Sequence, residues 1–371
     1  MKHKKKVLVL GATGSIGSSA IDILKAYPDQ YELTGVTAHT DAEALQKVQK
    51  DFPHIPTCLS SISGTKSLLD FIENNDADIV INGIAGASGL LPSRAALASG
   101  KHLALANKET IVMAGPLIRK LANDKGVQIL PVDSEHSAVF SLIQAHGTNR
   151  IKEIILTASG GPFRNYSREE LDKVQLSDAL NHPTWSMGPK ITIDSASLAN
   201  KGLEVIEACR LFDLPAERVK VVIHPQSLIH SLVRTTDGVL YAQMSPPDMR
   251  HPIALALSWP EYLPGTLKEL DFSQAISMDF QPPRHDAFPL LGMAYRAAAL
   301  SGGYTIAFNA ANEKAVEAFI EKKISFTMIA QVTAGVLERD WTKEPDSFEE
   351  VMEIDGCARD YASEEIRSLT S

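Results

Sequence analysis

The sequence predicts an α/β protein in three parts: an N-terminal doubly wound parallel sheet of the Rossmann-like type, a central α+β domain and a C-terminal helical domain. Short apolar runs alternate with amphipathic stretches up to about residue 133, as in doubly wound sheets. From Ile151 several strand-like runs follow one another, and the last part of the chain has helical periodicity. The expected parts are residues 1–133, 134–258, a proline-containing linker at 259–284, and 285–371.

Each expected element corresponds to one run of the sequence. The N-terminal strands are predicted in KVLVL, YELTGVTA, DADIVINGIAG, KHLALAN and VQILPVD. Helices are expected between them near Ser18–Ala26, Leu91–Ala98 and Ile111–Leu121. The central strands are predicted in KEIILTASGG, RVKVVIH, SLIHSLV and VLYAQM. The C-terminal helices are predicted in LLGMAYRAAALSG, NAANEKAVEAFIEKKIS and TMIAQVTAGVLER.

Composition excludes several classes of protein. With 45 acidic and 36 basic residues the net charge is −9, which argues against a nucleic-acid surface formed by bulk charge. No run approaches the ~18 apolar residues of a membrane span, and the basic N-terminal cluster is not followed by the apolar core of a signal peptide. The three cysteines are scattered, which predicts neither disulfides nor a cysteine zinc site. We therefore expect a cytoplasmic protein.

The stretch GATGSIG directly follows the first predicted strand. Its glycines, Gly11, Gly14 and Gly17, would let backbone N–H groups approach a pyrophosphate at the start of a helix. The spacing is GxxGxxG rather than GxGxxG, so a tight turn without a ligand remains an alternative. After the second strand, residues 37–41 offer neither an early acidic residue for a ribose hydroxyl nor an arginine for a 2′-phosphate.

Two families with similar glycine turns fit less well. Short-chain dehydrogenases need a tyrosine followed four residues later by a lysine, and none of the eight tyrosines has one. Acyl-phosphate-reducing semialdehyde dehydrogenases need a nucleophilic cysteine, and no cysteine here has a neighbouring histidine.

A pair of carboxylates follows the strand predicted in VQILPVD. Asp133 and Glu135 stand two residues apart where that strand ends, so both side chains are expected to point to one side. Carboxylate oxygens of this kind suit Mg²⁺ or Mn²⁺. The alternative is an acidic loop solvated by water.

A second polar cluster is predicted on the helix in DSASLANKGLEVIEACRLF. One stripe is apolar and is formed by Leu198, Gly202, Val205, Cys209 and Phe212. The other is polar and is formed by Ser197, Asn200, Lys201 and Glu204. We expect Ser195 near the start of this helix, where an anion is favoured. Glu204 would be a third metal carboxylate and Lys201 would face a phosphate, the alternative being a solvated polar face.

Three further segments fit a ligand site. The turn Ser159–Gly161 follows a strand and offers backbone N–H groups and a hydroxyl to a phosphate. The loop 182–188 combines a histidine, Trp185 and a glycine, as a lid that excludes water does. Residues 107–109 follow the strand in KHLALAN, where doubly wound sheets bind ligands. A lone loop tryptophan is more often a packing residue and a lone histidine more often structural, and the alternative for residues 107–109 is an ordinary helix cap.

Seven motifs in order resemble the 1-deoxy-D-xylulose 5-phosphate reductoisomerase family, over roughly residues 6–320. They are GATGSIG, ALANKET, PVDSEHS, TASGGPF, HPTWSMG, ITIDSASLANKGLE and VVIHPQSLIHS. The resemblance implies an N-terminal NADPH domain, a central catalytic domain that also forms a homodimer, and a C-terminal helical domain. It implies conversion of a phosphorylated sugar, 1-deoxy-D-xylulose 5-phosphate, to 2-C-methyl-D-erythritol 4-phosphate in isoprenoid precursor synthesis.

The resemblance also implies roles for single residues. The cofactor pyrophosphate would contact Thr13, Gly14, Ser15 and Ile16, and the nicotinamide half Asn107, Glu109 and Gly188. One Mg²⁺ or Mn²⁺ would be bound by Asp133, Glu135 and Glu204, and of these Glu135 and Glu204 would also contact the substrate. The substrate phosphate would be held by Ser159, His182, Ser195, Asn200 and Lys201, and its oxygenated carbons by Lys108 and Ser134. The lid would include Trp185 and Met187.

One segment departs from the family pattern, and two rival functions remain. After the second strand the family usually has a glycine, a basic residue and an asparagine, whereas this chain has His39-Thr40-Asp41, so the contacts to the 2′-phosphate are not predicted. The rivals are an NADP-dependent dehydrogenase of another phosphorylated small molecule, which has no need of three carboxylates, and a nucleotide-sensing protein without catalysis. The tail beyond about residue 340 resembles nothing that assigns it a role.

Overall fold

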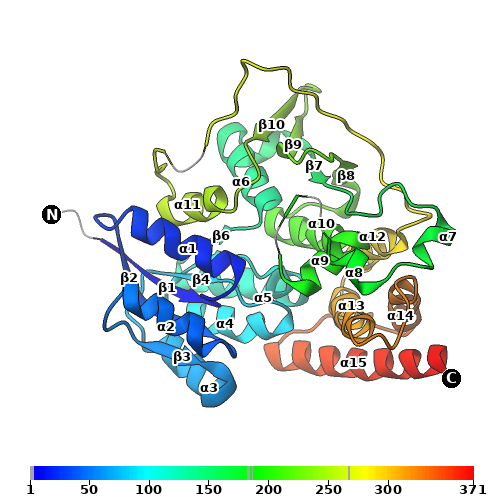
Figure 1. Ribbon diagram of the computed structural model, residues 1–371, viewed down its shortest axis with the longest axis horizontal. Helices are drawn as coiled ribbons and strands as arrows, with labels where there is room; N and C mark the ends of the chain where they lie inside the picture. Colours follow the sequence, from blue (N-terminus) through cyan, green and yellow to red (C-terminus); the bar gives the residue numbers. More distant parts are fainter. Residues whose placement is uncertain (1–3, 182–183, 186, 266–267) are drawn as a thin grey trace. The chain divides into compact units, whose positions relative to one another are not determined.

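The computed structural model describes residues 4–181, 184–185, 187–265 and 268–371 (Figure 1). The chain packs as two compact units. The first comprises Met1–Thr110, Ile118–Phe140 and Asp248–Glu269. The second comprises Ile111–Leu117, Ser141–Pro247 and Leu270–Ser371. The four-part division expected from the sequence stays a prediction, because each of the two units consists of three separate residue ranges.

The first unit contains a six-stranded parallel sheet in the order β3-β2-β1-β4-β5-β6. Its strands are β1 (Lys5–Leu10), β2 (Tyr31–Ala38), β3 (Thr57–Leu59), β4 (Ile79–Asn82), β5 (His102–Leu105) and β6 (Ile129–Pro131). This order reverses between β1 and β4, which is the switch point where doubly wound sheets bind dinucleotides. The glycine turn follows β1 and therefore lies at that point, so the predicted fold class is confirmed for this unit.

Helices connect the strands of this sheet, and α6 follows the last strand. They are α1 (Ser15–Ala26), α2 (Ala42–Asp51), α3 (Ser60–Glu73), η1 (Ala87–Gly89), α4 (Leu90–Ala98), α5 (Lys108–Lys125) and α6 (Ser134–His146). The sequence did not indicate α2, β3 and α3. In α2 only Leu45 is buried, and α3 is interrupted by Gly64 at φ +77°, so neither helix has a long apolar stripe.

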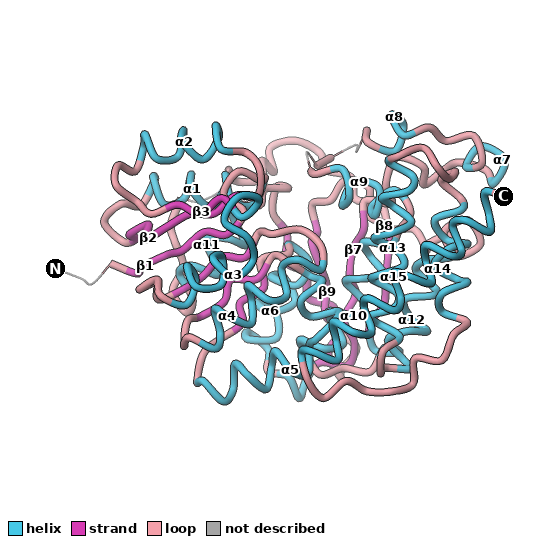
Figure 2. Tube along the Cα trace, turned by 90° about the horizontal axis from the view of Figure 1, so that it is seen from below, coloured by secondary structure: helices cyan, strands magenta, loops and turns pink. Residues whose placement is uncertain are grey.

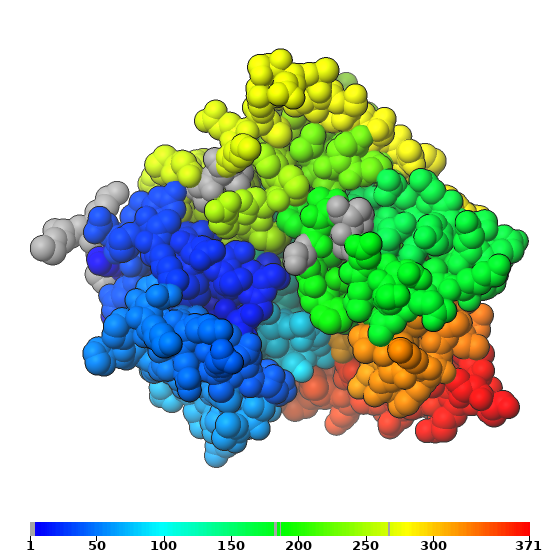
Figure 3. All heavy atoms as spheres, viewed as in Figure 1, coloured from blue at the N-terminus to red at the C-terminus, as the bar shows by residue number. Residues whose placement is uncertain are grey.

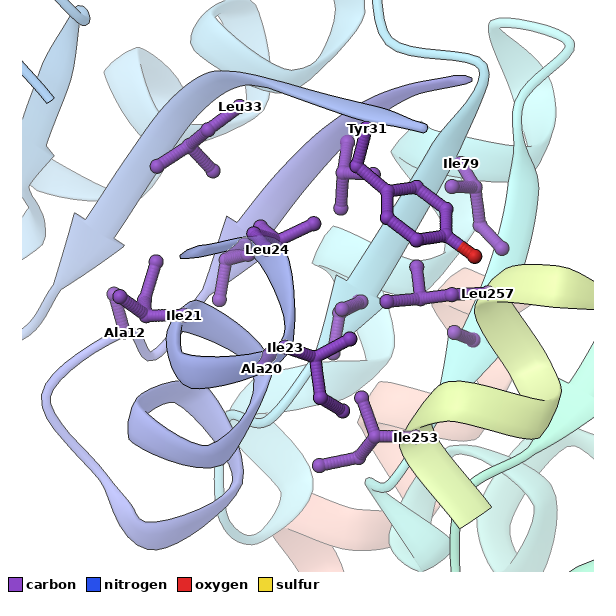
Figure 4. Packing of buried hydrophobic residues seen from close by; sticks show 14 of the residues in the cluster. Ala12, Ala20, Ile21, Ile23, Leu24, Tyr31, Leu33, Ile79, Ile253 and Leu257 are labelled. Atoms are coloured by element: carbon purple, nitrogen blue, oxygen red, sulfur yellow. The ribbon is translucent and has the colours of Figure 1, made fainter. Parts of the chain in front are cut away.

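The core of the first unit includes a helix that comes from far along the chain. Helix α11 (Arg250–Ser258) contributes Ile253 and Leu257 to the cluster that also contains Ile23 of α1 (Figure 4). The Lys5 ammonium donates to the Leu257 carbonyl at 2.7 Å, near the C-terminal end of α11. From the sequence this segment is expected in the central part, and no helix is predicted there.

The second unit contains a four-stranded mixed sheet in the order β10-β9-β7-β8. Its strands are β7 (Ile151–Ala158), β8 (Val219–Ile223), β9 (Ile229–Thr235) and β10 (Leu240–Met244), as the four apolar runs predict. Strands β7 and β8 are parallel, whereas β9 is antiparallel to both β7 and β10. This sheet is the predicted α+β part of the fold.

Two consecutive helices stand where the sequence predicted one. They are α9 (Pro189–Ala196) and α10 (Ala199–Phe212), preceded by η2 (Thr148–Arg150), α7 (Arg168–Leu171) and α8 (Leu176–Ala179). Ser195, expected near the start of the helix that carries Lys201, lies in the last turn of α9, shortly before α10 begins. Leu198 separates the helices in a left-handed conformation (φ +59°), which turns the chain between them.

The C-terminal residues are helical, as predicted (Figure 2). After η3 (Ala216–Arg218), the second unit ends with α12 (Pro289–Leu300), α13 (Tyr304–Ile320), α14 (Met328–Leu337) and α15 (Phe348–Thr370). The tail that resembled nothing forms α15, which buries Val351, Ala358 and Ala362 and packs on α13 and α14. In the part of the chain that the structure describes, no helix is both long and apolar enough to cross a bilayer.

The predicted linker at 259–284 is irregular. Its described residues form no helix and only one isolated bridge, between Gln281 and Ile223. Tyr262 and Phe272 are 72% and 74% exposed, and Figure 3 shows much of this segment on the surface of the face in view. The segment therefore crosses the surface, as its prolines indicated.

Gly17→Ala should destabilise the first unit. A Cβ at residue 17 would lie 2.3 Å from the Gly11 carbonyl oxygen and 2.4 Å from the Ala12 Cα, both backbone atoms that cannot move aside cheaply. We expect a loss of about 1–3 kcal/mol or more in the free energy of unfolding, measured by urea denaturation. Gly14→Ala is the matched control, because its Cβ would meet nothing closer than 3.5 Å. Equal losses for both variants would contradict this interpretation.

Candidate active site

The glycine turn after β1 has one glycine that the fold itself does not require. Gly11 adopts φ +73°, and Gly17 has no room for a Cβ, so both are needed for the turn. Gly14 has φ −82° and ψ 175°, which any residue adopts, and space for a Cβ. A glycine at residue 14 therefore keeps the approach to α1 open, as close contact with a ligand demands.

The N-terminus of α1 is open to an anion. No described side chain caps this helix, and the first turn carries no acidic residue. Ser15 is exposed, while Thr13 and Ile16 are partly exposed beside it. The unpaired N–H groups and the helix dipole favour a pyrophosphate here, so the residues present fit a dinucleotide.

The residues after β2 that depart from the family pattern, His39-Thr40-Asp41, make hydrogen bonds within the first unit. The Asp41 carboxylate accepts the Ala44 N–H at 2.9 Å and caps α2. His39 Nδ1 lies 3.0 Å from the Ser60 hydroxyl, which comes from the start of α3. The only carboxylate in residues 37–41 is thus engaged at a helix end.

Asn107 ties the start of α5 to the loop after β4. Its amide nitrogen donates to the carbonyls of Ile84 and Gly86, both at 2.8 Å, and to Glu109 at 3.0 Å. Its oxygen accepts the Thr110 N–H at 2.9 Å and so caps the helix. The helix-cap interpretation of this residue is therefore correct, and direct contact with a cofactor stays a prediction.

Lys108 and the carboxylates after β6 form a polar group in which the lysine is buried and the carboxylates are partly exposed. The Lys108 ammonium donates to Asp133 at 2.7 Å, and only 5% of Lys108 is exposed. Glu135 lies in the first turn of α6, and its N–H donates to Asp133 at 3.2 Å, while Ser134 donates to its carboxylate at 2.5 Å. Since β6 ends at Pro131, strand alternation does not place these carboxylates, and a helix start does.

The polar stripe of α10 is buried. Glu204 is 1% exposed and accepts hydrogen bonds from Asn200, at 2.5 Å, and from the Lys201 ammonium. Lys201 is itself 3% exposed, so the solvated-face alternative is wrong. A buried carboxylate persists only with a positive partner, which Lys201 supplies and a metal ion can supply equally.

The turn after β7 packs against the end of α9. Gly161 adopts φ +67°, and a Cβ on it would lie 2.8 Å from the Ser195 carbonyl oxygen. Its N–H donates to the Ser159 hydroxyl at 3.3 Å. The structure thus brings Ser159 and Ser195 close together, as the phosphate-site prediction requires.

Asn312, which the sequence pattern did not single out, holds α9 in place through Asp194. Asp194, 1% exposed, accepts from the buried Asn312 amide of α13 at 2.7 Å and from Lys190 at 2.9 Å. The signal for Asn312 in the sequence is an amide among the alanines of the NAANEKAV run.

The N-cap of α9 is Gly188, at φ −65° with nothing within 4 Å of a Cβ, so it resembles Gly14 in leaving a helix start open.

The predicted lid is only partly described. Trp185 and Met187 are partly exposed, whereas His182 lies outside the described residues. The roles of these three residues stay predictions.

A parallel sheet with an open glycine turn at its switch point, followed by helix starts that bury lysines with carboxylates, is the construction of a dinucleotide-dependent oxidoreductase. Known proteins identify the family. The 1-deoxy-D-xylulose 5-phosphate reductoisomerase model matches residues 7–61 and 43–115, its C-terminal domain residues 129–212, and the DXP reductoisomerase C-terminal domain residues 244–361.

Relatives match over almost the whole chain. The 1-deoxy-D-xylulose 5-phosphate reductoisomerase of Treponema denticola is 51% identical over 367 residues, covering 97% of this chain and 96% of the relative. That of Treponema pallidum is 47% identical over 359 residues, covering 96% of each. The chain belongs to the 1-deoxy-D-xylulose 5-phosphate reductoisomerase family, so the family predicted from the seven motifs is confirmed.

Solved structures agree. A crystal structure of DOX-P reductoisomerase in complex with NADPH, fosmidomycin and magnesium has a TM-score of 0.91 and 38% identity, covering 99% of each chain. The reductoisomerase from Zymomonas mobilis in complex with NADPH has a TM-score of 0.88 and 37% identity, covering 99% of this chain and 100% of that one. The predicted fold class is therefore confirmed for the whole chain.

Asn312→Leu should lower the free energy of unfolding by about 1–3 kcal/mol, because Asp194 loses its buried hydrogen-bond donor. Urea denaturation measures this. Asn309→Leu is the matched control, since Asn309 lies one turn earlier, is equally buried, and makes a longer bond of 3.4 Å to Glu313. An equal loss of unfolding free energy in the control would show that the hydrogen bond to Asp194 does not stabilise the fold more than the bond of Asn309 does.

Proposed function

We propose that this chain converts 1-deoxy-D-xylulose 5-phosphate to 2-C-methyl-D-erythritol 4-phosphate with NADPH and one Mg²⁺ or Mn²⁺, in the non-mevalonate route to isoprenoids. The proposal rests on family membership over almost the full length and on structures of relatives with NADPH and magnesium. The observation that carries it is the buried cluster on α10, where an amide, an ammonium and a carboxylate lie within hydrogen-bonding reach.

The cofactor would be bound at the glycine turn. Thr13, Gly14, Ser15 and Ile16 would hold the pyrophosphate at the start of α1, which the open N-cap supports. The nicotinamide half would be placed by Asn107, Glu109 and Gly188. Asn107 would act by fixing the loop after β4 and the first turn of α5, because its own amide is already engaged.

The divalent ion would be bound by Asp133, Glu135 and Glu204. Oxygen donors of this charge are the ligands that Mg²⁺ and Mn²⁺ prefer. Asp133 and Glu204 each have a lysine partner, so both positions favour a positive charge. When bound, the ion supplies Lewis acidity and NADPH a hydride.

The chain's own side chains would bind, orient and protect the substrate. Its phosphate would contact Ser159, His182, Ser195, Asn200 and Lys201, and binding this remote group orients the reacting carbons. Lys108 and Ser134 would contact the oxygenated carbons, and the Lys108 ammonium would stabilise developing negative charge and move protons at Nζ. Trp185 and Met187 would exclude water, which protects a reactive aldehyde.

The partner in the assembly would be a second copy of the chain. Strand β10 is a sheet edge, paired among the described strands with β9 alone, and its side carries exposed Val239, Leu240 and Tyr241. We propose that this edge contributes to a homodimer, and that the enzyme is cytoplasmic, in keeping with its three free cysteines.

The function is tested by following NADPH absorbance with 1-deoxy-D-xylulose 5-phosphate, first with Mg²⁺ and then with a chelator. We expect oxidation only with metal. Glu204→Gln should lower turnover by more than about 100-fold, equivalent to roughly 2.7 kcal/mol, while NADPH binding measured by fluorescence stays within about twofold. Glu217→Gln, an exposed glutamate of the same unit, is the control. Oxidation that persists in chelator would refute the metal assignment.

Leu240→Lys should convert a dimer to a monomer, because it places a charge on the proposed apolar edge. Light scattering after gel filtration at micromolar concentration measures the molar mass of the assembly. Lys220→Glu on the exposed side of β8 should leave the mass unchanged. A wild-type monomer under these conditions would contradict the dimer.

A further inference from the structure

Helix α5 is broken shortly after its first turn. Ala114 has non-helical angles, φ −134° and ψ 25°, and Pro116 stands inside the helix. Because proline has no N–H, the Val112 carbonyl cannot receive the hydrogen bond that residue 116 would normally donate. A break of this kind leaves carbonyl groups at the end of the first helical segment in need of donors.

Arg210 of α10 supplies those donors. Its Nη1 donates to the carbonyls of Val112 at 2.9 Å and Ile111 at 3.2 Å, and its Nη2 donates to the Thr305 hydroxyl at 2.7 Å. A guanidinium also complements the partial negative charge at the end of a helical segment. Burial lowers the pKa of Arg210 to about 10, so the group remains charged at neutral pH.

The surroundings are shaped for this arginine. A Cβ on Gly115 would lie 2.8 Å from the Arg210 Cδ, so the glycine beside the break leaves room for its stem. A lysine would reach the same place with one compact ammonium, whereas the planar guanidinium meets three acceptors at once. The contact is therefore specific to arginine.

We propose that Arg210 is a positioning residue for the reaction: by closing the break in α5 it fixes the direction of the segment 108–113, which begins with Lys108. This inference rests on the proposed function, which assigns Lys108 to the substrate. The proposed function assigns Arg210 no contact with substrate or cofactor. The Lys108 ammonium is held 2.7 Å from Asp133 at the opposite end of that segment, so a change in its direction moves the ammonium directly.

Arg210 could instead only satisfy buried carbonyls, and Pro116→Ala separates the two roles. Alanine at residue 116 restores an N–H four residues after Val112, so the carbonyl gains a partner within the helix. It also removes the cause of the break. In an Arg210→Met background it should therefore recover stability without recovering the direction of the first segment.

The experiment compares kcat, KM, NADPH affinity and thermal unfolding for four variants with the wild type. They are Arg210→Met, Arg210→Lys, Arg210→Met/Pro116→Ala and the control Arg296→Met, an exposed arginine of α12. We expect Arg210→Met and Arg210→Lys to lower kcat by about 10- to 100-fold, with the KM and Kd for NADPH within about twofold. The double variant should regain melting temperature but not kcat, and the control should match the wild type.

Two results would overturn the inference. One is wild-type kcat in Arg210→Lys or Arg210→Met, whatever the melting temperature, and the other is a double variant that regains kcat together with stability. If Arg210→Met does not fold, the kcat of Arg210→Lys decides. An inactive wild-type enzyme would instead refute the proposed function, so the two failures are distinguishable.

Discussion

The buried ion pair between Lys201 and Glu204 is the interaction on which the candidate site depends. Removing two charges from water costs several kcal/mol for each, so neither can lose its partner without a replacement. In the proposed function a phosphate takes the lysine and a divalent cation takes the glutamate. When the phosphate binds Lys201, Glu204 loses its partner and the metal ion replaces it; when the metal ion binds Glu204, the phosphate replaces the partner of Lys201. The affinities of substrate and metal are therefore coupled through helix α10.

The same constraint explains why the site lies at helix ends. Lys108 begins α5, Glu135 lies in the first turn of α6, Ser195 lies in the last turn of α9, and Gly14 and Gly188 precede α1 and α9. Helix starts offer unpaired N–H groups and a favourable field for anions, while short connections between helices fix side-chain positions closely. The backbone therefore helps to stabilise the Glu135 carboxylate and a bound anion, whereas the Lys108 ammonium, at a helix start, is stabilised by Asp133.

The sequence predicted most strands of the two sheets and the glycine turn after β1, because apolar runs and glycine spacing are local signals. It could not predict that Leu198 divides one helical pattern in two, since a left-handed leucine is held by tertiary packing. It placed Asp133 and Glu135 at the end of a strand, whereas that strand ends at Pro131 and Glu135 lies in the first turn of α6. Asn312 and Arg210 were missed because their partners, Asp194 and the broken α5, are distant in sequence.

Helix α11 gives the chain a particular order of assembly during synthesis. The first sheet is complete by Pro131, yet its core includes Ile253 and Leu257, and Lys5 binds a carbonyl 252 residues away. A nascent chain that has emerged only as far as β6 exposes the apolar surface that α11 covers. The nucleotide-binding unit can therefore reach its native core only after all four strands of the other unit's sheet have been translated, and until then the emerging chain carries an exposed apolar surface of the kind that chaperones bind.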